Sequence, residues 1–359
     1  MKNLINISLT LNFLIIVSCE NFSSIEKLNL DPHIIFTSRR WWNYDLFITN
    51  IYGDQITHLT KNEWLDFNPA ISASGNKLAF VSNRDGNREI YIMDLIWRDG
   101  YKQWEAQNLI NITNSVENDW TPNFSPVTDK IVFSTYFPSN DNYDIFTMNS
   151  DGSGKKNITN TSFYEKNPQF SPDGSFILYQ GWKRGKMEIF FVNLLENNNI
   201  NISKNSSSND IISQGNAISP DGQKVVFTSD RDNNKNIYIM NIDGSNLKQL
   251  TFDIADDYEP IFSYDGLSII FTSNRDGNKE VYLMTNEGLE IENISNNSAD
   301  DWNPRIFPDS KKIIFQSLRD GPSNWEIYIM NIDGSSQKNL TNNPSTDYSY
   351  VILPLKPII

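Results

Sequence analysis

Cysteine is almost absent from this chain of 359 residues, in which Cys19 is the single one. One cysteine cannot form a disulfide within the chain, so other interactions must stabilise the fold. Histidine is nearly as rare: His33 and His58 are the only two, and they lack the clustered spacing of a zinc site. We therefore predict no metal and no cofactor, and we expect both histidines to be structural.

Positive charge is also scarce. The 30 lysines and arginines are outnumbered by 44 aspartates and glutamates, which gives a net charge of −14. Because a nucleic-acid surface needs clustered Lys and Arg side chains to contact phosphates, this balance argues against nucleic acid and anionic membrane surfaces as main partners. No Gly-x-Ser-x-Gly segment precedes a helical pattern, as a hydrolase nucleophile would require. The sequence predicts a protein that is not an enzyme.

Long apolar runs are missing except near the N-terminus, at Leu9–Val17. This run is too short to span a bilayer as a mature helix and is typical of a signal peptide, which we predict for residues 1–18. The segment Ile16–Cys19 resembles the lipobox of bacterial lipoproteins, which implies cleavage before Cys19 and lipid attachment to it. A plain secretory signal with an incidental cysteine is the alternative. Residues 19–32 are polar and non-periodic, as expected of a lipidated tether.

The chain is rich in one repeated pattern of turns and short strands, which is clearest in Ser219–Thr251. Ser-Pro-Asp-Gly at the start of this stretch and Asp-Gly near its end are turn sequences. Between them, Lys224–Ser229 and Asn236–Met240 carry the β-branched and aromatic residues and the two-residue period of strands. With one short run before and one after, the pattern predicts a unit of four antiparallel strands.

Seven such units follow one another at intervals of 44 to 53 residues. An aromatic anchor marks the second strand of each unit: Phe36, Phe80, Phe133, Tyr179, Phe227, Phe271 and Phe315. This period is typical of β-propeller blades. The first unit lacks its first strand, whereas Asp347–Pro354 at the C-terminus aligns with Asp301–Pro308, which opens the seventh unit. We predict an all-β, seven-bladed propeller over residues 33–359, with the first blade closed by the C-terminal strand.

The repeat motif runs S-P-D-G, apolar-apolar-Phe, S-x-R-D-G-N, x-I-Y-x-M, N-x-D-G-S and L-T. It resembles the PD40, or WD40-like, repeat of the TolB family of propellers over nearly all of Ile34–Leu355. The α/β domain that precedes the propeller in TolB is not part of the resemblance. The resemblance implies a protein-binding or scaffold module in the periplasm or cell envelope. With the lipobox it implies a lipid-anchored protein, and Glu20 after the cysteine favours the outer membrane facing the periplasm.

Two sets of residues recur on one face of the predicted propeller, around the mouth of its central channel. One is a basic residue four positions after the anchor: Arg40, Arg84, Lys183, Arg231, Arg275 and Arg319, with Phe137 in the third unit. The other is an acidic residue followed by an aromatic one: Asp66 and Phe67, Asp119 and Trp120, Asp257 and Tyr258, Asp301 and Trp302, and Asp347 and Tyr348. The fourth unit, with Glu165 and Lys166, and the fifth, with Gln214 and Gly215, break this acid-aromatic pattern. These charges can pair and stabilise the fold, or unpaired members can join the aromatics in a binding site.

The second unit carries an unusually long connection with Trp97 and Trp104, on the opposite face. These tryptophans are candidates for binding or for packing on a neighbour, as are Trp41 and Trp42 in the first unit. The alternative function is a glycan-binding or carbohydrate-active propeller that uses the carboxylates and aromatics at the channel. Polysaccharide lyases that resemble this repeat use histidine-rich metal sites, which this sequence lacks.

Overall fold

The computed structural model describes residues 31–40, 43–183, 185–196, 198–204 and 209–354. All regular elements in these ranges are β-strands, which confirms the all-β prediction, and no helix here could cross a membrane. The signal peptide, Cys19 and the Trp41–Trp42 pair lie outside the described residues. The predicted tether is described only at Asp31 and Pro32, which form no regular element.

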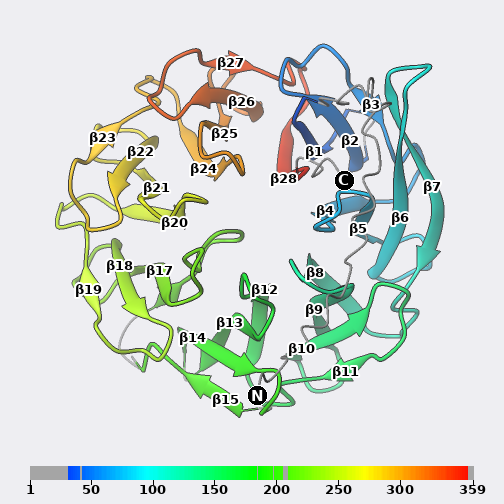
Figure 1. Ribbon diagram of the computed structural model, residues 1–359, viewed down its shortest axis with the longest axis horizontal. Coiled ribbons are helices and arrows are strands. Elements are labelled where there is room, and N and C mark those ends of the chain that lie inside the picture. Colours follow the sequence, from blue (N-terminus) through cyan, green and yellow to red (C-terminus); the bar gives the residue numbers. More distant parts are fainter. Residues whose placement is uncertain (1–30, 41–42, 184, 197, 205–208, 355–359) are drawn as a thin grey trace, which may run out of the picture. The chain divides into compact units, whose positions relative to one another are not determined.

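Five of the sheets have four antiparallel strands each, connected in chain order apart from the first strand of the first sheet (Figure 1). The first sheet is β28 (Asp347–Ile352), β1 (His33–Ser38), β2 (Asp45–Asn50) and β3 (Thr57–His58). The second is β4 (Asp66–Ile71), β5 (Lys77–Ser82), β6 (Glu89–Arg98) and β7 (Gln103–Asn111).

The last three of these sheets are the most regular. They are β16 (Asp210–Ile211), β17 (Lys224–Ser229), β18 (Asn236–Asn241) and β19 (Lys248–Gln249); β20 (Asp257–Phe262), β21 (Ser268–Ser273), β22 (Glu280–Thr285) and β23 (Glu292–Asn293); and β24 (Asp301–Ile306), β25 (Lys312–Ser317), β26 (Glu326–Asn331) and β27 (Lys338–Asn339). In each of them the outermost strand has only two residues, so little backbone is left unpaired at the edge.

The third and fourth units share one eight-stranded sheet, which differs from the expected separation into single units. Its strands are β8 (Asn118–Phe124), β9 (Lys130–Phe137), β10 (Asn142–Asn149), β11 (Lys156–Asn157), β12 (Tyr164–Phe170), β13 (Phe176–Lys183), β14 (Lys186–Asn193) and β15 (Asn198–Asn201). A single parallel pair, Tyr143 with Tyr164, joins β10 to β12. The two tyrosine rings lie 5.7 Å apart, so the units are joined at this one point by a backbone pair and a ring contact.

The turn sequences form the turns that their chemistry predicts. In the fifth unit the Ser219 hydroxyl accepts from the amide of Lys224 at 2.9 Å, and Asp221 accepts from the amide of Gln223 at 3.0 Å. The second turn ends at Gly244, whose φ is +81°. A side chain there would collide with the carbonyl oxygen of Ile202 in the preceding unit, so this glycine is required both by its backbone conformation and by close packing.

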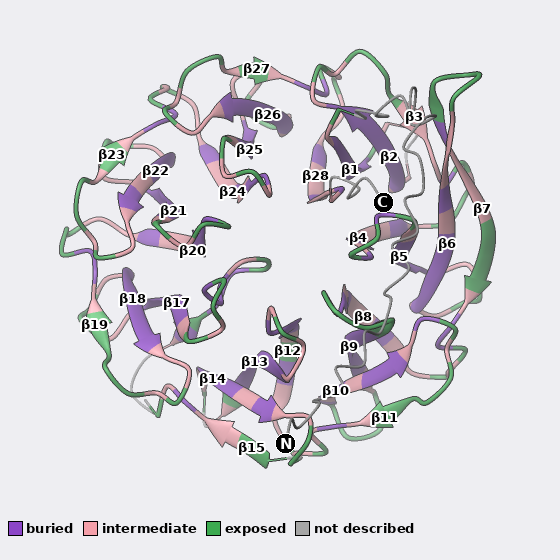
Figure 2. Ribbon diagram, viewed as in Figure 1, coloured by how far each residue is buried: buried purple, intermediate pink, exposed green. Residues whose placement is uncertain are grey.

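The core consists of the faces of the middle strands, and burial decreases toward the outermost strands (Figure 2). All seven aromatic anchors are at most 1% exposed. Apolar residues from successive units form common clusters. For example, Phe227 and Tyr238 of the fifth unit pack with Leu178 and Ile189 of the fourth. Each unit is therefore stabilised chiefly by its neighbours.

The two ends of the described chain meet in the first sheet. β28 pairs with β1 in antiparallel register, with Ile34 opposite Ile352. One hydrophobic cluster contains Phe36 and Tyr350 of the first sheet together with Ile314 of the seventh unit. At Gly53, where φ is +70°, a Cβ atom would lie 2.5 Å from the Leu340 carbonyl oxygen. The first and last units are thus in direct contact.

We expect Phe271→Ala to lower the free energy of unfolding by about 3–5 kcal/mol, because it empties a fully buried site between two units. Chemical denaturation measures this change. The matched control is Phe252→Ala, since Phe252 is 77% exposed and its loss should cost less than about 0.5 kcal/mol. Equal costs for the two variants would contradict the core described here.

We expect removal of residues 347–359 to destabilise the whole folded body, because it opens one edge of β1 and removes Tyr350 from the cluster that joins the first and last units. A thermal melt should show one transition at a clearly lower temperature. A chain shortened only by residues 355–359 is the control. If the longer deletion melts like the control, β28 is not essential to the fold.

Candidate functional site

The recurring basic and acidic residues form buried ion pairs. Arg40 with Asp347, Arg84 with Asp66, and Arg231 with Asp210 lie 2.9 Å apart, Arg275 with Asp257 3.1 Å, and Arg319 with Asp301 2.5 Å. The aspartate side chains are 0% exposed and the arginines 12–16%. Of the two interpretations left open by the sequence, this geometry matches the structural one for these pairs.

Each arginine is also held by aromatic rings. The Arg275 guanidinium lies 5.6 Å from the Phe271 ring and 4.7 Å from the Tyr282 ring. The Tyr282 hydroxyl donates to Asp276, which directly follows the arginine. Asn278 completes the R-D-G-N motif by donating to the carbonyl of Asn297 at 3.0 Å. The motif therefore fixes the loop after the second strand to the strands and the crossover beside it.

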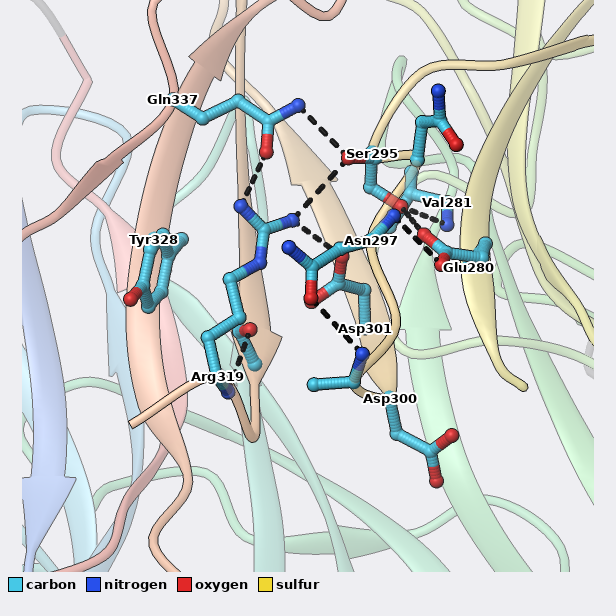
Figure 3. A network of polar contacts seen from close by, with 12 residues as sticks. Glu280, Val281, Ser295, Asn297, Asp300, Asp301, Arg319, Tyr328 and Gln337 are labelled. Carbon is cyan, nitrogen blue, oxygen red and sulfur yellow. Dashed lines mark hydrogen bonds and ion pairs between the residues drawn. The ribbon is translucent and has the colours of Figure 1, made fainter. Parts of the chain in front are cut away.

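Figure 3 shows the corresponding network in the seventh unit. Arg319 contacts Asp301 and donates to Gln337, which belongs to the connection before β27. Beside it, the Ser295 hydroxyl donates to the buried Glu280 and accepts from the amide of Val281 at 2.8 Å. In the first, second, sixth and seventh units, the hydroxyl of the L-T or I-T or I-S ending thus donates to the acidic residue that opens the third strand.

In the third unit a lysine replaces the arginine as the cation beside the acidic residue. Phe137 stands where other units have arginine, and the Lys155 ammonium lies 3.9 Å from Asp119 instead. Lys155 also lies 5.4 Å from the Phe133 ring, the position that arginine takes elsewhere. Burial raises the pKa of Asp119 to about 6.

The fourth unit has an acid without a cation. Glu165 is buried and accepts from the Thr161 hydroxyl at 2.8 Å. Lys183, the predicted basic residue of this unit, lies over the Phe163 ring at 5.1 Å and forms no ion pair with the described residues. Burial raises the pKa of Glu165 to about 7, so this carboxyl holds its proton where the other units use arginine.

The fifth unit corrects one reading of the sequence. Gln214 and Gly215 are not its counterpart of the acidic position, because Asp210 in β16 pairs with Arg231. A longer connection between β16 and β17 separates this aspartate from the Ser-Pro-Asp-Gly turn, which concealed the match.

The aromatic residues after the acids remain partly exposed. They form the set called here the mouth aromatics: Phe67, Trp120, Tyr258, Trp302 and Tyr348. Rings of neighbouring units lie close, with centroids 6.0 Å apart for Phe67 and Trp120 and 6.2 Å for Tyr258 and Trp302.

Three of the mouth aromatics are covered by cations. The Arg88 guanidinium lies 4.2 Å from the Trp120 ring, the Lys279 ammonium 4.1 Å from the Trp302 ring, and the Lys235 ammonium 4.7 Å from the Tyr258 ring. Such cation–π contacts hold the rings in place while part of each stays accessible.

The long connection of the second unit is the hairpin of β6 and β7. Trp104 is 5% exposed, and its ring lies 5.6 Å from those of His33 and Trp97. Trp97 is partly exposed and donates from Nε1 to Asp99 at 2.6 Å. These contacts match packing on a neighbour, since His33 belongs to β1. His58 likewise stacks on Phe47, with centroids 4.2 Å apart.

A cavity of about 530 Å³ lies among the first strands, where the sequence predicted a central channel, but most of its lining residues were not predicted. Two positions after the acid, each of six units has a residue with positive φ: Asn68, Thr121, Asn167, Glu259, Asn303 and Ser349. The strand register shifts beside all six of these residues. Because of these bulges, the six residues line the cavity. The proline that follows in five units was the available signal.

The cavity lining contains two charged residues, Glu259 and Arg305, among amides and apolar side chains. Burial raises the pKa of Glu259, and the nearby Arg305 opposes that shift. No group of three or more His, Cys, Asp or Glu suited to a metal ion occurs in the described ranges.

We expect the free energy of unfolding to decrease as pH rises between about 4.5 and about 7, because the unfolded chain releases the Glu165 proton in this window while the folded chain keeps it. Glu165→Gln removes this pH-dependent loss of stability. The free energy of unfolding of the variant should therefore exceed that of the wild type by about 2 kcal/mol at pH 8 and equal it near pH 4. Denaturation at several pH values measures the difference. The exposed Glu287→Gln is the control, and an equal pH response of both variants would contradict the assignment.

Comparison with known proteins agrees with the repeat motif. Residues 203–347 match the family model of the TolB beta propeller domain, PD40. A protein TolB homolog of Chlorobium luteolum is 26% identical over 162 residues, which are 45% of this chain and 34% of that protein. The Tol-Pal system protein TolB of Anaeromyxobacter dehalogenans is 25% identical over 118 residues, 33% of this chain and 26% of that protein. The matches thus span about a third or less of these relatives.

Solved structures share the fold. TolB from Acinetobacter baumannii superposes with a TM-score of 0.56 at 19% identity, over 90% of this chain and 67% of that one. An oligogalacturonate lyase from Vibrio parahaemolyticus superposes with a TM-score of 0.65 at 14% identity, over 83% and 86% of the two chains. At these identities the likeness extends to the fold alone. Residues 203–347 thus match the PD40 family of TolB propellers, and the described chain shares its fold with TolB.

Proposed function

We propose that residues 33–354 form a closed propeller of seven blades that binds another protein in the cell envelope. The eight-stranded sheet counts as two blades, because a single residue pair joins its halves. The pairing of β28 with β1 and the cluster shared by the first and last units support closure. The relative named as a Tol-Pal system protein supports a role in the envelope.

The observation that carries the proposal is the set of mouth aromatics and their cations. Trp, Tyr and Arg are the residues that dominate binding energy at protein interfaces. Trp120 with Arg88, Trp302 with Lys279 and Tyr258 with Lys235 place these types together, partly exposed and already ordered. Ordering before binding lowers the entropic cost of docking a partner.

Catalysis has less support in this geometry. The carboxylates at the strand starts are buried and engaged by arginine, lysine or a hydroxyl, so they are poorly placed to act as acid and base on a glycan. The neighbouring lyase structure keeps carbohydrate binding as the alternative function. We further propose that lipid on Cys19 anchors the protein to the outer membrane, facing the periplasm.

The test is affinity capture from envelope extracts with residues 31–359 as bait, followed by identification and quantification of each captured protein. We expect Trp120→Ala to reduce recovery of the specific partner at least about tenfold, as for a hot-spot residue. Tyr101→Ala is the control, because Tyr101 is 81% exposed at the tip of the β6–β7 hairpin. Thermal melts verify that both variants fold. Equal recovery with both variants would show that the mouth aromatics do not bind the partner.

A further inference from the structure

The two charges in the cavity break the internal repeat at two separate positions. Glu259 occupies the positive-φ position, with φ of 50°. Asn68, Asn167 and Asn303 occupy it in three other units, and asparagine tolerates this conformation better than longer residues do. A glutamate here is therefore not explained by the bulge itself.

Arg305 is the second departure. It lies four positions after the acid of the seventh unit, where other units have uncharged residues such as Ala70, Asn123, Ile261 and Val351. The two departures belong to β20 and β24, the first strands of adjacent units. They bring opposite charges into one cavity whose other lining residues are neutral.

Neither charge forms an ion pair with the described residues, although Glu259 accepts a backbone hydrogen bond from Asn303 and lies near Arg305 and Lys279. Arg305 donates from Nη1 to the carbonyl of Pro304 at 2.8 Å, and no carboxylate of the described residues lies within 4.0 Å of it. The Glu259 Oε2 atom is buried without a hydrogen-bond partner in the described part of the chain. An unpaired charge in a partly dry cavity costs stability, so its presence calls for a partner.

We propose that this cavity binds a small zwitterion, an amino acid or a peptide of two or three residues. The ammonium group would pair with Glu259 and the carboxylate with Arg305, while amides such as Asn68, Asn123 and Asn216 face the neutral part. A neutral sugar would leave both charges unpaired and desolvated, and an ion of one sign would be repelled by one of the two residues. The volume of about 530 Å³ lies within the range of small-molecule sites.

This site goes beyond the proposed protein-binding role. Trp302 and Tyr348 line the cavity as well as its mouth, whereas Trp120 and Arg88 do not line it. Variants of Trp120 therefore test the partner, and variants of Glu259 and Arg305 test the small ligand. Either proposal can fail without the other.

The test uses residues 31–359 and a panel of the twenty free L-amino acids, Ala-Ala and Ala-Ala-Ala, with N-acetyl-alanine amide as the compound without charged termini. Melting temperature and calorimetric titration are measured at about 10 mM ligand. At least one zwitterion should raise the melting temperature, and the blocked compound should not. Arg305→Met should weaken that binding at least about tenfold, whereas Arg98→Met, which removes an exposed arginine from the β6–β7 hairpin, should not.

A second variant separates a binding role from a structural one. Glu259→Asn removes the unpaired carboxylate and restores the residue found at this position in other units. Without ligand its melting temperature should rise, by on the order of 2 °C, while zwitterion binding is lost. A lower melting temperature would mean that Glu259 serves the fold. That result would overturn the proposal. So would a panel in which no zwitterion binds, a blocked compound that raises the melting temperature as much as a zwitterion does, or a zwitterion affinity that is unchanged in Arg305→Met.

Discussion

A carboxylate removed from water at the start of each first strand is the constraint on which the rest of the structure depends. Such a group must meet a positive charge or keep its proton, because an uncompensated charge in the interior is too costly. In five units an arginine pairs with this carboxylate, and in the third unit Lys155, from the opposite end of the unit, takes the place of the arginine. In the fourth unit the carboxyl of Glu165 keeps its proton instead. The arginine in turn packs between two aromatic rings, so the anchors, the tyrosine of the third strand and the loop between them all follow from this one requirement.

Much of this could be predicted from the sequence, because turns and strands are local. Phe271 and its six counterparts were identified as core by their place in the repeat, and pairing of the arginine with the acid was one of the two interpretations that their common recurrence left open. Asp210 was missed because the connection after it is longer than in other units. The residues that line the cavity were missed because their positions depend on backbone bulges at residues such as Asn68, and a bulge changes which way a side chain points without leaving a strong pattern in the sequence. The joining of two units through Tyr143 and Tyr164 is a tertiary contact that no local pattern encodes.

The repeat also separates structural from functional candidates. Residues that recur in several units, such as the R-D-G-N loops of the second and sixth, bond to nearby strands and leave little free for a ligand. The mouth aromatics recur too, but their rings stay partly exposed beneath cations. Glu259 and Arg305 do not recur at all, and in the described chain neither forms an ion pair and Glu259 Oε2 has no hydrogen-bond partner. In a protein built from near-identical units, departures from the repeat are therefore more informative about ligands than the repeat itself.

The pairing of β28 with β1 has a consequence for how the chain is made. More than 300 residues separate these neighbours, so β1 leaves the ribosome long before the strand that covers it exists. Bringing together segments so far apart in sequence is slow and costs chain entropy. The first sheet cannot be completed until β28 has been synthesised, and until then the growing chain keeps one edge of β1 unpaired.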